Sequence, residues 1–166
     1  MATTAVIRPD EFTLRFTRRT VIQYGYNGRR QMTLERVTTL GGATDDHVQS
    51  IGRGYDNLAR LTLVTSYSGN NANGDTRNQV QILRNSFGQV TTSNQSHEGA
   101  VDGSTLKVQY AYDTTKSGSE FTRGHRPTST TYPAGRVVFN DYGTSTSISS
   151  LLSRVAKLRN ANSSGT

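Results

Sequence analysis

Few residues of this chain have the types and spacing that could support catalysis or metal binding. Its three histidines, His47, His97 and His125, lie far apart in polar segments, and none has a second histidine two to four residues away. Asp45 and Asp46 precede His47 and complete the densest titratable cluster, but this cluster lacks the spaced oxygen ligands of a calcium loop. Solvated loop side chains are the preferred interpretation of both features. We therefore expect no metal site and no cofactor.

The sequence motifs of common enzymes are also missing. There is no Gly-x-Ser-x-Gly elbow for a nucleophilic serine, and no phosphate-binding loop that ends in Gly-Lys-Ser or Gly-Lys-Thr. Cysteine is absent, which excludes disulfides and thiolate metal sites. We therefore expect a protein that is not an enzyme, and we assign no catalytic residue.

Arginine is the residue type through which this chain could bind a charged ligand. The formal net charge is +7, and it divides into +4 for residues 1–36, −1 for residues 37–125 and +4 for residues 126–166. A basic patch can bind the phosphates of nucleic acid or an anionic glycan. The candidate anion-binding residues are Arg15, Arg18, Arg19, Arg29, Arg30 and Arg36. Basic ends are also common on proteins that bind neither ligand, and this second interpretation is favoured.

Tyrosine is the other residue type that could bind a ligand. Aromatic faces bordered by Asn and Gln can stack on sugars or on bases. Packing between neighbouring strands is the favoured alternative, because aromatic pairs stabilise sheets. The tyrosines expected on or beside strands are Tyr55, Tyr67, Tyr110, Tyr112, Tyr132 and Tyr142.

An eight-residue pattern, here called the octet, recurs at residues 26–33, 55–62 and 84–91, which are 29 residues apart. Each copy has Asp or Asn at its second place, Arg or Gln at its sixth, an apolar residue at its seventh and Thr at its eighth. The residues that carry it are Tyr26, Asn27, Gln31 and Thr33, then Tyr55, Asp56, Arg60 and Thr62, then Asn85, Gly88, Gln89 and Thr91. A looser fourth copy at residues 131–138 carries Tyr132, Gly135 and Arg136.

The octet is typical of a tight turn followed by a strand. Asp and Asn hydrogen-bond the backbone two residues further on, and Gly tolerates the positive φ that tight turns need. The residues that follow each octet are rich in β-branched and aromatic types. A fixed period of this length indicates a repeat architecture in which each unit buries its apolar side against its neighbours.

At these residues the chain resembles the YD-repeat, or Rhs (rearrangement hot spot), family of bacteria. The family unit runs Tyr-Asp, two variable residues, Gly-Arg, an apolar residue and often Thr, and residues 55–62 match it except for Ala59 in place of Gly. The resemblance implies part of a large secreted or surface-exposed β structure, which in the best-known members is a hollow shell around a toxic C-terminal domain. Arg30 and Ala59 stand where the family has the turn glycine, so either these turns are remodelled or the copies are degenerate. The family's self-cleavage motif has no counterpart, and no catalytic residue is carried over.

The expected fold is mainly β, built of stacked antiparallel β-hairpin repeats. Hydrophobic residues make up only 32% of the chain, which suits a thin sheet with much polar surface. The organisation we predict is a non-repeat lead-in over residues 1–20, a repeat region over 21–145, and a tail over 146–166 that is either a short helix or a fifth degenerate unit. The expected strands are 12–18, 20–26, 32–40, 48–55, 61–67, 79–83, 106–112 and 135–142, with polar loops at 41–46, 68–75, 94–105 and 114–126.

Two of these segments carry a more detailed prediction. In residues 106–112, Val108, Tyr110 and Tyr112 alternate and should share one face of the sheet. In the tail, the apolar residues from Ile148 to Leu158 have helical spacing, and Ser145, Thr146 or Ser147 could cap such a helix.

The functional hypothesis is a non-enzymatic structural β-repeat module of an Rhs-like bacterial surface or secreted protein, which builds a sheet wall or shell. The alternative is a basic binding module for nucleic acid or anionic glycan. The expected partners are neighbouring repeats, or further copies that associate through exposed sheet edges. The first residues contain no signal-peptide pattern and no apolar run is long enough to span a membrane. Family resemblance favours secretion or the cell surface, and a cytoplasmic location stays open.

Overall fold

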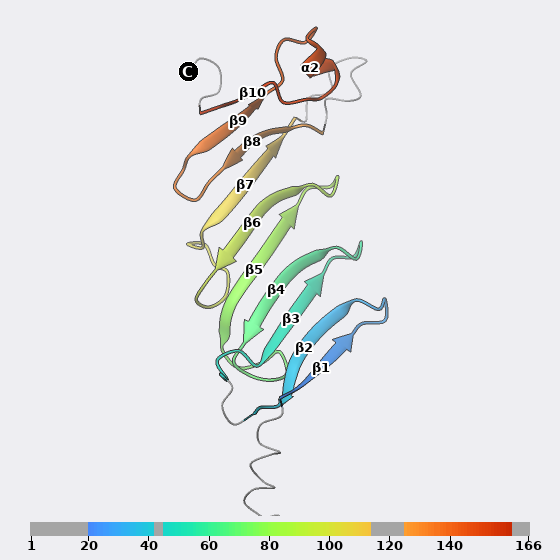
Figure 1. Cartoon of the computed structure of the whole chain (residues 1–166), viewed down its shortest axis with the longest axis vertical. Helices are drawn as coiled ribbons and strands as arrows, with labels where there is room; N and C mark the ends of the chain where they lie inside the picture. Colours follow the sequence, from blue (N-terminus) through green and yellow to red (C-terminus); the bar gives the residue numbers. More distant parts are fainter. Residues whose placement is uncertain (1–19, 42–44, 114–124, 161–166) are drawn as a thin grey trace, which may run out of the picture. The chain divides into compact units, whose positions relative to one another are not determined.

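The computed structural model describes residues 20–41, 45–113 and 125–160 of the 166-residue chain. These residues form ten antiparallel strands in one open sheet, and the spatial order of the strands is their order in the sequence (Figure 1). The expected mainly β fold of stacked hairpins is therefore confirmed. The strands are β1 (Val21–Tyr26), β2 (Met32–Thr39), β3 (Ser50–Tyr55), β4 (Leu61–Tyr67), β5 (Thr76–Arg84), β6 (Val90–Ser96), β7 (Lys107–Tyr112), β8 (Pro127–Thr131), β9 (Val137–Asp141) and β10 (Lys157–Arg159).

The chain divides into two compact units, which are described separately below. The first unit comprises residues up to Val80 together with Ser96–Asp102, and the second comprises Gln81–Gln95 and the residues from Gly103 onward. The first unit therefore holds β1 to β4 and the beginning of β5. The second holds the end of β5, most of β6, and β7 to β10.

The strand predictions agree with the structure over most of the described chain. The strand predicted at 61–67 coincides with β4, and the alternation predicted in 106–112 is confirmed because Val108, Tyr110 and Tyr112 are half-buried while Lys107, Gln109 and Ala111 are exposed. Strand β8 was not predicted, since Thr and Ser predominate in it and it has no apolar alternation. The strand predicted at 12–18 and most of the loop predicted at 114–126 lie outside the described residues.

In the first unit the two faces of the sheet differ in polarity. On one face, here called the loop-covered face, the cross-strand row is Gln23, Arg36, Ser50 and Tyr67. The loop between β4 and β5 folds onto this face, where Ser50 donates a hydrogen bond to the Gly69 carbonyl and accepts one from the Ala72 amide. The opposite face is more apolar and carries Ile22, Val37, Tyr24, Ile51 and Val64, together with an ion pair at 3.1 Å between Glu35 and Arg53.

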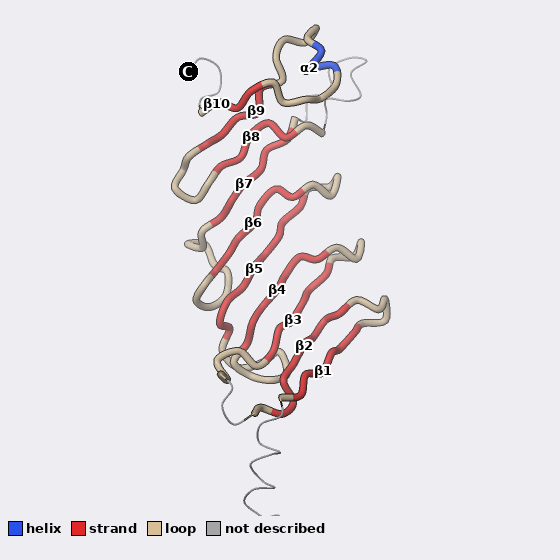
Figure 2. Tube along the Cα trace, viewed as in Figure 1, coloured by secondary structure: helices blue, strands red, loops and turns tan. Residues whose placement is uncertain are grey.

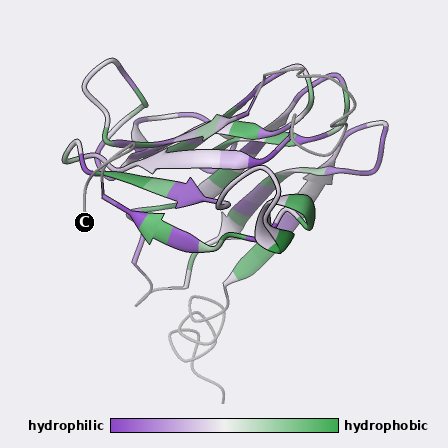
Figure 3. Cartoon of the chain, turned by 90° about the horizontal axis from the view of Figure 1, so that it is seen from above, coloured by the Kyte–Doolittle hydropathy of each residue, from purple (hydrophilic) through white to green (hydrophobic). Residues whose placement is uncertain are grey.

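In the second unit a similar separation follows from the strand register. One face is polar and includes Asn94, whose side-chain amide donates to Gln81 Oε1 at 3.0 Å. The other face carries Val108 opposite Ser93, and Tyr110 in one row with Thr130 and Val138. Green and purple segments alternate along the strand ribbons in Figure 3, as expected for side chains that point to opposite faces in turn.

The described residues contain no buried hydrophobic side chain. The most buried side chains are polar, with Thr65 at 1% and Ser50 at 2% relative exposure. A hydrogen bond from Gln79 to Thr65, 2.8 Å long, satisfies the Thr65 hydroxyl oxygen. An open single-layer sheet has no second layer against which to form an apolar core, so each strand depends on its neighbours for burial.

The tail contains both of the elements that the sequence left open. Helix α2 (Ile148–Leu151) is only one turn long and is capped by Ser147, whose hydroxyl accepts from the Ser150 amide. The helical spacing wrongly predicted a helix as far as Leu158, because Lys157–Arg159 instead forms β10, which pairs with β9. The chain between β9 and β10 is thus an enlarged hairpin connection that contains α2.

Candidate functional site

The octets form hairpin turns that share one backbone conformation (Figure 2). In the first octet, the Asn27 amide donates to the Gln31 carbonyl and the Arg30 amide donates to the Asn27 carbonyl. The same two hydrogen bonds recur in the other three octets, at 2.8–3.0 Å. This arrangement is a three-residue hairpin loop in which a type I turn is followed by a residue with positive φ. All four predicted turns are therefore present.

The side chains at the second and sixth places of the octet form a matched pair. In the first turn, Asn27 Oδ1 accepts from the amides of Arg29 and Gln31, while Asn27 Nδ2 donates to Gln31 Oε1 at 3.0 Å. The third turn repeats this network with Asn85 and Gln89. An Asn at the second place therefore goes with Gln at the sixth, because the amide pair supplies one donor and one acceptor.

The second turn makes the same contacts with charged groups. Asp56 Oδ1 accepts from the amides of Leu58 and Arg60, and Asp56 Oδ2 accepts from Arg60 Nε at 2.7 Å. The hydrogen bond from the Arg60 amide is the largest influence on Asp56 and lowers the pKa of its carboxyl below the ordinary value of 3.8. Partial desolvation opposes this change, and the Arg60 guanidinium adds to it.

The fifth place of each octet has positive φ whatever residue it carries. The angle is 60° at Arg30, 66° at Ala59, 85° at Gly88 and 81° at Gly135. The first two turns are thus not remodelled, although a residue with a Cβ replaces glycine in them. A left-handed conformation costs a non-glycine residue roughly 1–2 kcal/mol, which the side-chain network of the turn offsets.

Side chains of one turn donate to the backbone of the next. Arg29 Nη1 donates to the Asn57 carbonyl at 2.8 Å, and Gln31 Nε2 donates to the Ala59 carbonyl at 2.7 Å. In the second unit, Gln89 Nε2 donates to the His125 carbonyl at 3.1 Å. These forward contacts connect hairpins at their tips. Arg29, Gln31 and Asn57 line a hollow of about 330 Å³ together with Tyr55 and Asp56.

A second contact runs backward from each hairpin to the one before it. The Tyr55 hydroxyl donates to the Met32 carbonyl at 2.7 Å, the Tyr112 hydroxyl to Val90 at 2.9 Å, and the Tyr142 hydroxyl to Pro127 at 3.0 Å. In each case the tyrosine lies just before the connection to the next strand. Its hydroxyl contacts the preceding hairpin, at the first residue of that hairpin's second strand. We call this hydrogen bond the tyrosine latch. The octet includes Tyr55 as a motif residue, but it includes neither Tyr112 nor Tyr142, and it predicted this contact for none of the three.

The third hairpin has Arg84 where the latch tyrosine would stand. Its Nη1 atom is buried and has no hydrogen-bond partner among the described residues. Tyr112 was missed because the residues after Asp113 do not continue the octet. The signal that could have found it is the Tyr-Asp pair itself, which lies 57 residues beyond Tyr55 and Asp56, close to two repeat periods.

The turn of the fourth octet lies at the opposite end of the strands from the turn of the third octet. Within the second unit, the turn at 85–89 joins β5 to β6, whereas the turn at 132–136 joins β8 to β9 and so points in the opposite direction, as Figure 1 shows. Tyr132 has replaced the Asp or Asn of the second place, and Arg136 donates instead to Asn160 at 3.2 Å.

The connection between β9 and β10 packs on one buried arginine. Arg126 is 6% exposed, donates to the Ser153 hydroxyl at 3.0 Å and to the Ser150 carbonyl, and lies 4.9 Å from the centre of the Tyr142 ring. Burial raises the pKa of Tyr142 above its ordinary value of 10.0, and the positive charge of Arg126 opposes that rise. This cluster holds the connection between β9 and β10 against the start of β8.

The candidate anion-binding arginines do not form one group. Arg29 is bound to the neighbouring turn, and Arg36 lies at the opposite end of its hairpin, where it donates to Gln23 Oε1 and to Asn71 Oδ1. Arg30 is exposed at the tip of the first turn. Arg15, Arg18 and Arg19 lie outside the described residues.

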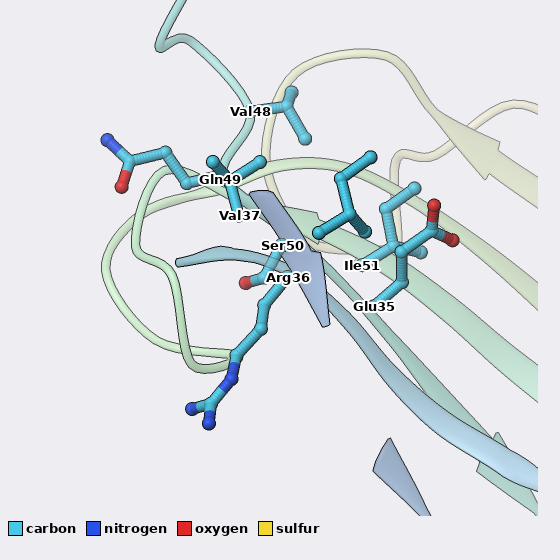
Figure 4. Close-up of a pocket in the computed structure, with 8 residues that line it drawn as sticks. Glu35, Arg36, Val37, Val48, Gln49, Ser50 and Ile51 are labelled. Atoms are coloured by element: carbon cyan, nitrogen blue, oxygen red, sulfur yellow. The ribbon is translucent and has the colours of Figure 1, made fainter. Parts of the chain in front are cut away.

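The hollows of the sheet are shallow and chemically mixed. One of about 130 Å³ lies beside Val37, Val48 and Ile51, with Glu35 and Arg36 at its border (Figure 4). Another, of about 310 Å³, is lined by Tyr110 and Tyr112 with Ile82, Val90 and Ser93. The hydroxyl of Tyr112 is engaged in its latch, and the rings of Tyr110 and Tyr112 both line this hollow.

Three of the titratable residues singled out in the sequence, Asp45, His47 and His125, make structural contacts, although those of His47 involve only its backbone. The Asp45 carboxylate accepts from the His47 amide, the His47 carbonyl accepts from Arg77, and His125 packs edge-on against Phe87 at 5.0 Å. Among the described residues, no three His, Cys, Asp or Glu side chains are grouped so that they could hold a metal ion. No helix in the described part of the chain is long and apolar enough to cross a membrane.

Comparison with known proteins adds no relative to this description: no family model matches the chain, and no curated protein matches it significantly.

Proposed function

We propose that this chain is a structural β-repeat module of a bacterial surface or secreted protein of the Rhs type, and that it has no catalytic activity. Its task is mechanical, because hairpins that are joined edge to edge build a wall or shell. The resemblance of the octets to the YD repeat supports this proposal. A location outside the cytoplasm follows from the same resemblance.

The tyrosine latch is the observation that carries the proposal. It recurs at Tyr55, Tyr112 and Tyr142, and in each case the hydroxyl joins one hairpin to the hairpin before it. The described residues bury no apolar side chain, so contacts between neighbouring hairpins take the place of a core. Stability that arises between adjacent repeats is characteristic of structural repeat proteins.

The test is a variant in which Tyr55, Tyr112 and Tyr142 are all replaced by Phe. Each replacement keeps the ring and removes one hydrogen bond, worth about 1 kcal/mol, and the sites are far apart in sequence and share no partner. Urea unfolding followed by far-UV circular dichroism should therefore show a loss of about 3 kcal/mol. If the triple variant is as stable as the parent chain, the latches do not hold the hairpins together and the proposal fails.

The alternative, a basic binding module, is separated from this proposal by its dependence on salt. A site built from Arg29, Arg30 and Arg36 would bind single-stranded DNA or heparin, and its affinity would fall steeply as salt rises. A structural wall has no such ligand. Titration of both polyanions at low and at physiological salt, with a variant in which the three arginines are replaced by Gln, distinguishes the two functions.

A further inference from the structure

Strand β1 forms an edge of the sheet that is exposed along its length. Tyr26 is 62% exposed, Tyr24 is 51% exposed and Ile22 is 49% exposed, although all three are large and apolar or aromatic. In the interior strands β3 and β4 of the same unit, every residue is half-buried or buried. An exposed edge with apolar side chains is a template for pairing with another strand.

The groups that join hairpins elsewhere are present at this edge and have no partner among the described residues. Tyr26 holds the same place in its octet as Tyr55, yet its hydroxyl makes no hydrogen bond within the described part of the chain. The carbonyls of Asn57 and Ala59 accept the forward contacts of the preceding turn. Their equivalents in the first turn are the carbonyls of Gly28 and Arg30, which accept no hydrogen bond from the described residues.

The opposite edge, in the second unit, is closed to such pairing. Strand β10 is only three residues long, and Lys157 and Arg159 both form ion pairs with Asp141. Short edge strands with basic side chains are a common device against edge-to-edge association. The two edges therefore differ in kind, and β1 is the edge at which the described residues include unused latch groups.

We propose that the β1 edge binds one further β-hairpin that has the same octet and is presented, with its second strand free, by another polypeptide. This inference rests on the proposed structural function, and it names the partner that would extend the sheet at β1. The second strand of that hairpin would pair antiparallel with β1, as β2 pairs with β3. Its fourth- and sixth-place side chains would donate to the Gly28 and Arg30 carbonyls, and Tyr26 would donate to its seventh-place carbonyl.

A second folded copy of this chain does not meet these requirements. Its own β2 is already paired with β3, and its other edge is the short β10. If two β1 strands paired antiparallel about a two-fold axis, their turns would lie at opposite ends and no latch would form. A separate hairpin of the same type could repeat at β1 the contacts that join the first two hairpins, so it is the favoured partner.

The probe is a labelled peptide with the sequence of residues 20–40, which carries Arg29 and Gln31 as forward donors. We expect fluorescence anisotropy to show saturable binding of this peptide to the full chain. The matched control peptide has R29A and Q31A, and the matched host variant is Tyr26→Phe. Each lost hydrogen bond should weaken binding about five-fold, because it is worth about 1 kcal/mol.

Hydrogen exchange locates the bound peptide. The β1 amides should become protected while those of β10 stay unchanged. Absence of binding, equal binding of the control peptide, protection of β10, or a dimer of the chain alone that protects β1 would each overturn the inference. Tyr26→Phe should have the same stability as the parent chain. Failure of peptide binding would therefore overturn this inference without affecting the proposed function. The proposed function itself would be refuted by an unchanged stability of the triple tyrosine variant.

Discussion

At the scale of single residues, the octet works because its second place organises the turn. Asn27, Asp56 and Asn85 each accept two backbone amide hydrogen bonds with one oxygen and bind the sixth-place side chain with the other side-chain atom. Polar groups that are fully satisfied in this way stabilise a turn without an apolar core behind it. The second turn alone does so with a carboxylate, and this makes it sensitive to pH.

The stability of the second turn should fall in acid. The pKa of Asp56 lies below 3.8 in the folded chain, chiefly because its carboxylate accepts the Arg60 amide. A group with a lowered pKa stabilises the fold fully above its ordinary pKa, and this stabilisation is lost as the pH falls through the folded value. We therefore expect the melting temperature to decrease as the pH is lowered from about 5 to about 2.

The matched control is the double variant D56N with R60Q, which gives the second turn the side-chain pair of the first and third. It has no carboxylate at this position, so its melting temperature should decrease less over the same range. Asp141, whose pKa is also lowered, chiefly by the Gly143 amide, is present in both proteins and cancels in the comparison. Equal slopes in the two proteins would show that Asp56 is not a source of the acid sensitivity.

At the scale of elements, the turn conformation prevails over the preference of the residue at its fifth place. Ala59 is exposed and has a φ of 66°. Ala59→Gly removes the left-handed strain of roughly 1–2 kcal/mol from the folded chain. The same change costs roughly 0.4–1 kcal/mol of stability, because glycine gives the unfolded chain a greater entropy. We expect a net gain of about 0.5 kcal/mol in urea unfolding.

The reverse change at the fourth turn is the control. A Cβ added at Gly135 would meet no other atom within 4 Å, so Gly135→Ala has a purely conformational cost. It should destabilise the chain by about 1 kcal/mol, because Gly135 has a φ of 81°. If Ala59→Gly destabilises the chain or Gly135→Ala is neutral, the fifth place does not require the left-handed conformation in solution.

The sequence predicted the elements whose causes are local. Asn27, Asp56 and Asn85 predicted turns because each contacts residues only two and four positions away. The direction of the fourth turn was not predictable from its octet, since the same local hydrogen bonds form at either end of a strand. The helix was predicted as far as Leu158 from apolar spacing, but pairing of Lys157 with Asp141 across the sheet overrides that spacing.

The latches were beyond prediction for a related reason. Tyr112 and Tyr142 act on carbonyls 22 and 15 residues away, in a hairpin whose position only the register of the sheet determines. Tyrosines near strands indicated packing or stacking, and nothing local distinguishes a ring that packs from a hydroxyl that donates. Strand β8 was missed because its pairing with β7 and β9, and not its composition, makes it a strand.

At the scale of the whole molecule, the described residues bury no apolar side chain, which implies that a local change should have local effects. In a protein whose stability arises between neighbouring hairpins, loss of one latch should open the two hairpins that it joins and leave distant hairpins protected. Tyr55→Phe and Tyr112→Phe are a matched pair for this question, because each removes one latch of similar length, at 2.7 and 2.9 Å, from a different unit.

Native-state hydrogen exchange on the two variants should therefore give complementary maps. In Tyr55→Phe, amides of β1 to β4 should exchange about five-fold faster while those of β8 and β9 keep their parental rates, and in Tyr112→Phe the affected amides should be those of β5 to β8. A chain that unfolds in a single cooperative step would instead accelerate the slowest amides of all strands equally in both variants. That result would mean that the hairpins do not act as units, because the opening of any one of them would require the opening of the whole sheet.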